Sequence, residues 1–106
     1  MKAFRLNELR AGIDQLDDEI ISLLAKRFAL TEEVGLYKAI NKLEAQDPKR
    51  ESTQFHKIIQ LSDTHGLKPD YATTIYRCLM DVVISRHEEI KQSYDGQNLI
   101  GQIEAR

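Results

Sequence analysis

The chain is poor in residues that break or crosslink a fold. It has 106 residues with two prolines, five glycines, one cysteine and no tryptophan. The single cysteine, Cys78, cannot form an internal disulfide, which is typical of a reducing compartment. We expect Cys78 to be a small buried residue on a helix rather than a reactive thiol. Repeats and low-complexity tracts are also missing, so one domain is predicted.

Long apolar runs and a surplus of one charge sign are missing too. No run of about 18 apolar residues occurs, so we expect no contact with a membrane. The first residues, MKAFRLNELRAG, lack the apolar core of a signal peptide, so a cytoplasmic location is predicted. A net charge of -2 gives no uniformly basic surface, which argues against nucleic-acid binding. His56, His65 and His87 show no ligand spacing, so we expect no metal site.

What the chain does have is a long helical pattern in its first forty residues. We predict a helix from about Asn7, as the N-cap, to about Asn41, and Gly35 within it predicts a close approach of a ligand or another helix. Such a helix is roughly 50 Å long. A compact domain of this size is only roughly 26 Å across, so we expect the helix to pack against a second chain. The apolar seam that would face the partner is Leu9, Ile13, Leu16, Ile20, Leu23, Leu30 and Val34.

Two further helices follow. The Asp-Pro pair at 47–48 predicts an N-cap and a first-turn proline, and the His-Gly pair at 65–66 predicts the end of that helix. Pro69 begins the third helix and Gly96 is predicted to end it.

The fold class is therefore predicted to be all-α, with a three-helix protomer. The β-branched residues follow helical spacing and never the alternation of a strand. We predict one domain over residues 1–94, and a C-terminal tail over residues 95–106 whose order the sequence leaves open.

Three cations accompany the seam of the first helix: Arg10, Arg27 and Lys38. Arg27 occupies a seam position and Lys38 continues it, and a buried cation is costly unless an anion meets it. Arg27 and Lys38 share one face roughly 16 Å apart, so they could bracket a small ligand with two carboxylates. Arg10 lies roughly 25 Å from Arg27, on another side of the helix. It could reach the same ligand only from an antiparallel partner helix.

Other candidate residues have two interpretations each. In the first interpretation, Asp47 and Glu51 only stabilise the N-terminus of a helix by their charge. In the second, Glu51 neighbours Lys38 and holds a substrate hydroxyl. His87 shares a face with Val83, four residues earlier, and is either a surface histidine or a pocket residue.

The string LNELRAGIDQLDDEIISLLAKRFALTEEVGLYK, followed by DPKRE, resembles the all-alpha chorismate mutases, the AroQ type. The resemblance covers about Leu6 to Lys91. These enzymes convert chorismate to prephenate by a Claisen rearrangement in aromatic amino-acid biosynthesis. The resemblance implies that no cofactor is used, and that the protein is an intertwined homodimer with two sites shared between protomers.

By matching positions, the resemblance also implies residue roles. Arg27, together with Arg10 of the partner subunit, would clamp the two carboxylates of chorismate. Lys38 would donate to the ether oxygen, where negative charge grows. Glu51 and the backbone near Asp47 would hold the ring hydroxyl.

Arg50 would support these residues, while two positions depart from the family pattern. Val83 stands where a serine is usual, and His87 stands where a glutamine donates to the ether oxygen. A histidine can still donate through a ring N–H. These departures leave the substrate open among close relatives.

Three other functions compete with chorismate mutase. Two are enzymes of the same fold, an isochorismate pyruvate lyase and an aminodeoxychorismate mutase. Glu51 favours the mutase over the lyase because it is placed to read a ring hydroxyl. The third is a non-catalytic helical dimer that binds a metabolite and regulates a partner, and an intact Lys38 and Glu51 argue against it.

Overall fold

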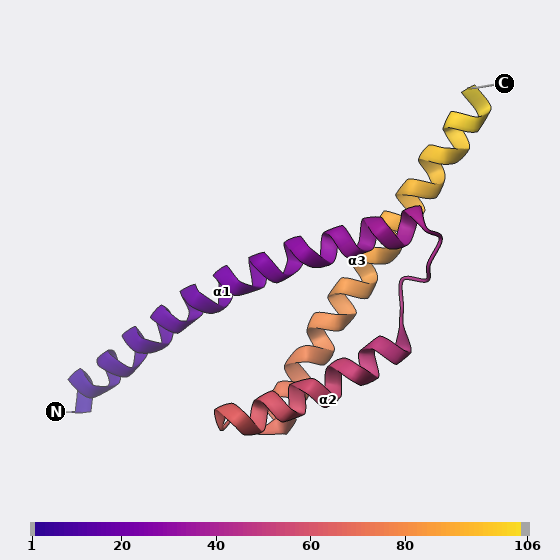
Figure 1. Ribbon diagram of the computed structural model, residues 1–106. Helices are drawn as coiled ribbons and strands as arrows, with labels where there is room; N and C mark the ends of the chain where they lie inside the picture. Colours follow the sequence, from indigo (N-terminus) through magenta and orange to yellow (C-terminus); the bar gives the residue numbers. More distant parts are fainter. Residues whose placement is uncertain (1, 105–106) are drawn as a thin grey trace. The chain divides into compact units, whose positions relative to one another are not determined.

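The computed structural model describes residues 2–104, and the side chains of residues 5–97. This part of the chain contains helices and no strand (Figure 1), which confirms the all-α prediction. The helices are α1 (Lys2–Ile40), α2 (Pro48–His65) and α3 (Pro69–Glu104).

The chain divides into two compact units, one ending at Thr31 and one beginning at Glu32. The first unit is the greater part of α1, and its apolar seam is exposed. A solvent-exposed apolar stripe of this length is typical of an interaction surface. Five seam residues keep between 48% and 63% of their surface accessible: Leu9, Ile13, Leu16, Ile20 and Leu23.

The second unit is built on a hairpin of α2 and α3, which lie side by side (Figure 1). The predicted ends of α2 are confirmed. The Asp47 carboxylate accepts from the backbone N–H of Arg50 at 3.0 Å, which caps the N-terminus. Gly66 follows His65 with φ 69°, a left-handed conformation that glycine adopts without steric cost.

The buried core of this unit is small. Its apolar members within the described part are Ala39, Ala45, Ala72, Met80 and Ile90. Most of them are small side chains, which lets helices approach closely but buries little apolar surface.

Two predicted boundaries are wrong. α1 begins at Lys2, because no proline or glycine before Asn7 stops the helix there. α3 continues through Gly96 to Glu104, since an interior glycine costs only about 1 kcal/mol and no proline follows. The helix thus enters the predicted tail, whose last two residues, 105–106, lie outside the described part, and the domain limit at residue 94 stays a prediction.

The prediction of a buried Cys78 is also wrong for the single chain, where this residue is exposed. Within the described residues, no helix combines the length and apolar character needed to cross a membrane.

Candidate active site

The Lys38 ammonium is fixed by two contacts within the second unit. It donates to the backbone carbonyl of Ala45 at 2.9 Å, and it lies 3.3 Å from Nδ1 of His87. An ammonium has three N–H donors and no acceptor, so the contact with His87 requires Nδ1 to accept. In the tautomer that accepts at Nδ1, the ring proton of His87 lies on Nε2. The two contacts use two of the three Lys38 donors and leave the third for a ligand.

His87 is buried, with 4% of its surface accessible, and it lies against Gly35 of α1. A Cβ at position 35 would be 2.6 Å from Cδ2 of His87 and 2.8 Å from Cδ1 of Ile90. Only a glycine lets the two helices approach this closely without a shift. The predicted close approach at Gly35 is confirmed, and the approaching element is α3.

The Glu51 carboxylate is held on both oxygens. Arg77 donates to Oε1 at 2.7 Å, and Gln46 donates to Oε2 at 3.2 Å. The Arg77 hydrogen bond, followed by that of Gln46, holds the pKa of Glu51 below its ordinary value of 4.5. Glu51 is therefore an ionised acceptor at neutral pH.

Arg77 and Gln46 were missed by sequence reasoning. Arg77 stands four residues before Asp81, a spacing that by itself predicts an ordinary surface ion pair within one helix. Its bond to Glu51 joins residues 26 positions apart, and no local pattern signals such a contact.

The other predicted residues take the following places. Asp47 and Arg50 lie at the exposed start of α2, where Asp47 acts as the N-cap. Val83 is half-buried, one turn before His87 on α3. Arg10 and Arg27 belong to the first unit, where Arg10 is exposed and Arg27 is half-buried. The structure thus brings Lys38 and His87 together, while Glu51 bonds Arg77 and Gln46.

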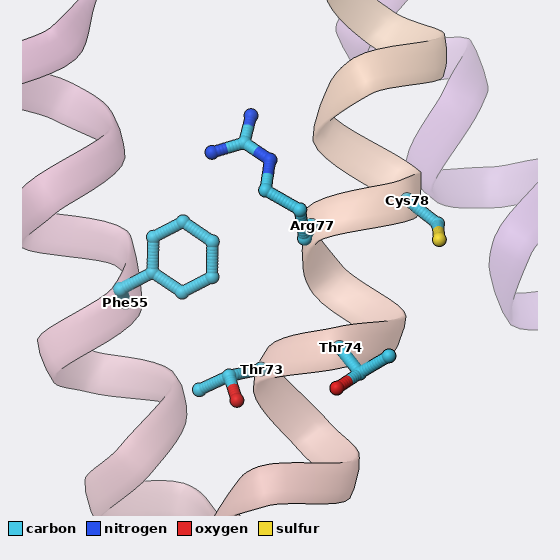
Figure 2. A pocket seen from close by; sticks show the side chains of 5 residues that line it. All are labelled: Phe55, Thr73, Thr74, Arg77 and Cys78. Carbon is cyan, nitrogen blue, oxygen red and sulfur yellow. The ribbon is translucent and has the colours of Figure 1, made fainter.

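A hollow of about 450 Å³ lies between α2 and α3. Figure 2 shows Arg77 reaching from α3 toward α2 beside the Phe55 ring, and the guanidinium carbon lies 5.5 Å from the ring centroid. The residues that line the hollow are Phe55, Thr73, Thr74, Arg77 and Cys78. Within the described residues, no group of three histidine, cysteine, aspartate or glutamate side chains could hold a metal ion.

Lys38 and Glu51 thus belong to a small all-α domain, in which the one is an ammonium held by two contacts and the other an ionised carboxylate held by two donors. The chain belongs to the family described as chorismate mutase type II, whose model matches residues 9–88.

Several curated proteins are similar to the chain. It is 36% identical over 94 residues to the bifunctional chorismate mutase/prephenate dehydratase of Aquifex aeolicus, covering 86% of this chain and 26% of that protein. It is 29% identical over 77 residues to the chorismate mutase of Methanocaldococcus jannaschii, covering 73% of this chain and 78% of that one. A T-protein of Haemophilus influenzae is 30% identical over 96 residues, covering 91% of this chain and 23% of the relative. The chain thus spans about a quarter of the length of the bifunctional relatives.

Proposed function

We propose that the chain is a chorismate mutase, an isomerase that converts chorismate to prephenate without a cofactor. The observation that carries this proposal is the Lys38 ammonium, fixed by Ala45 and His87 with one N–H donor to spare. Because the chain belongs to the chorismate mutase type II family, we take the ether oxygen of chorismate as the target of that donor.

The reaction needs position and charge rather than proton transfer. The ether C–O bond breaks while a new C–C bond forms within the same molecule, so no proton or electron passes to the enzyme. Negative charge grows on the ether oxygen as its bond to carbon breaks. A donor already fixed in place stabilises that charge without reorganisation, and the loss of one such donor typically costs about 10²–10³ in kcat.

Glu51 supports a hydroxyl-bearing substrate. Its ionised oxygens accept hydrogen bonds and cannot donate them, so they suit the ring hydroxyl of chorismate. Asp47 and the backbone at the start of α2, with Arg50, would complete this end of the site. Val83 offers only an apolar contact at its position.

The site would be completed by a second copy of the chain. The exposed seam of α1 supports a homodimer, because its apolar surface is the kind that an antiparallel helix buries. In such a dimer Arg27, together with Arg10 of the partner subunit, would pair with the two carboxylates of chorismate. The single cysteine supports a cytoplasmic location.

The alternative substrates are isochorismate, with loss of pyruvate, and aminodeoxychorismate. The decisive experiment incubates purified protein with each of the three compounds and follows prephenate or free pyruvate. Prephenate formed from chorismate supports the proposal. Pyruvate released only from isochorismate would replace it with the lyase, and binding without turnover of any compound would favour a regulatory dimer.

A further inference from the structure

The geometry points to Arg77 as a positioning residue for the reaction, one that fixes the Glu51 carboxylate in the orientation that receives the ring hydroxyl of the substrate. This inference rests on the proposed function, because it takes Glu51 as the hydroxyl acceptor. Arg77 itself has no part in the carboxylate clamp or in the donor at the ether oxygen.

The contact between Arg77 and Glu51 is short, and Glu51 is the more buried of the two side chains. Nη2 of Arg77 lies 2.7 Å from Oε1 of Glu51, and the Glu51 side chain is 15% exposed against 43% for Arg77. Gln46 occupies the second oxygen at 3.2 Å. A carboxylate has about four lone-pair sites, so about two remain for a ligand, and their directions are set by these two donors.

Arg77 is itself held on two further sides. Its Nε and Nη2 donate to one oxygen of Asp81 at 3.1 and 2.9 Å. Its guanidinium lies over the Phe55 ring, as Figure 2 shows. A planar guanidinium with partners on three sides has little freedom to rotate, so it passes a fixed geometry to Glu51.

The same contact governs the charge on Glu51. The Arg77 hydrogen bond is the largest cause of the lowered Glu51 pKa. Without Arg77 the pKa would rise toward the ordinary value, and the carboxyl would take up a proton at a higher pH. A protonated carboxyl has lost one acceptor site and gained a donor, so it reads the substrate hydroxyl less well.

The test compares Arg77→Ala, Arg77→Gln and Arg77→Lys with wild type in the full-length protein, using chorismate as the probe. We expect Arg77→Ala to lower kcat/KM by roughly ten- to a hundredfold, the range of one hydrogen bond to a charged group. The acid limb of its kcat/KM profile should move to higher pH. Arg77→Gln keeps a donor without the charge, so it should recover part of the loss in kcat/KM and part of the displacement of the acid limb, because hydrogen bonding is a larger cause of the lowered Glu51 pKa than the charge. Arg77→Lys should restore the acid limb toward that of wild type.

Asp81→Asn is the matched control. It removes the charge of the other ion pair of Arg77 but keeps a side-chain oxygen that can accept from the guanidinium. Arg77 therefore stays held against Glu51, and the acid limb of this variant should coincide with that of wild type. Thermal melting of every variant separates a loss of fold from a loss of position.

The outcomes separate the two proposals. A wild-type protein that makes no prephenate overturns the proposed function. An active wild type whose Arg77→Ala variant keeps the same acid limb overturns the role of Arg77 alone. Equal displacement of the limb in Asp81→Asn and Arg77→Ala would also overturn it, because the effect would then follow surface charge and not the contact with Glu51.

Discussion

Gly35→Ala is expected to separate activity from stability. The new Cβ would lie 2.6 Å from Cδ2 of His87, where ordinary contacts begin at 3.4 Å. The His87 ring would therefore have to move by about 0.8 Å, the difference between these two distances. Its contact with Lys38 is already 3.3 Å, so a shift of this size can break it.

The magnitudes predict different effects on folding and on catalysis. Overpacking of a buried site costs about 1–3 kcal/mol, while alanine in place of an interior helical glycine gains about 1 kcal/mol. The net loss of stability of Gly35→Ala is then between about 0 and 2 kcal/mol. A misplacement near 1 Å can cost about 10²-fold in rate, so we expect kcat to fall by roughly ten- to a hundredfold.

The assay pairs urea denaturation with kcat on chorismate. Gly96→Ala serves as the control, because a Cβ at position 96 meets nothing within 4 Å. This variant should keep full activity and gain up to about 1 kcal/mol of stability. If Gly35→Ala matches Gly96→Ala in both measurements, the close approach of α1 to α3 does not hold Lys38 in place.

Three further predictions follow from the same contacts. Lys38→Ala should lower kcat by about 10²–10³ with a smaller change in KM, measured at saturating chorismate, and a near-normal kcat would remove Lys38 from the mechanism. Mixing Arg10→Ala with Lys38→Ala under verified subunit exchange should restore part of the activity, because one site of the heterodimer then carries neither change; no recovery would refute the shared site. The Arg86 hydrogen bond, at 2.6 Å, lowers the pKa of Glu32 below 4.5. Glu32 therefore stabilises the fold above that pH and loses this contribution as the pH falls through its lowered pKa. Below pH 4.5 the free energy of unfolding should fall more steeply with pH in wild type than in Arg86→Ala. Equal slopes in the two proteins would contradict this reasoning.

The two ends of α2 could be predicted from the sequence because local interactions determine them. The aspartate cap, the first-turn proline and the terminal glycine each act within a few residues, so their effect does not depend on the rest of the fold. The outer ends of α1 and α3 lack such signals. Asn7 and Gly96 are only weak preferences, and the helices continue through both.

The candidate site was readable only in part, because its contacts join distant residues. Lys38 meets His87 across 49 positions, and the sequence placed both near one pocket only through the family pattern. No sequence motif predicts the contact of Lys38 with the Ala45 carbonyl or that of Glu51 with the Arg77 guanidinium. Cys78 was misjudged because the single chain leaves its side of α3 uncovered.

Stability and catalysis are coupled in the proposed dimer. Catalysis by positioning requires charged side chains to stay fixed, and a rigid setting normally comes from a well-packed core. This chain buries five apolar residues within its described part, three of them alanines, and exposes Ile13, Leu16 and Leu23. The apolar surface needed for rigidity is therefore present on α1 but lies outside the core of one chain. Covering it with a second copy would add the missing burial and, in the same step, bring Arg10 to the other protomer, so dilution to monomers should abolish activity and structure together.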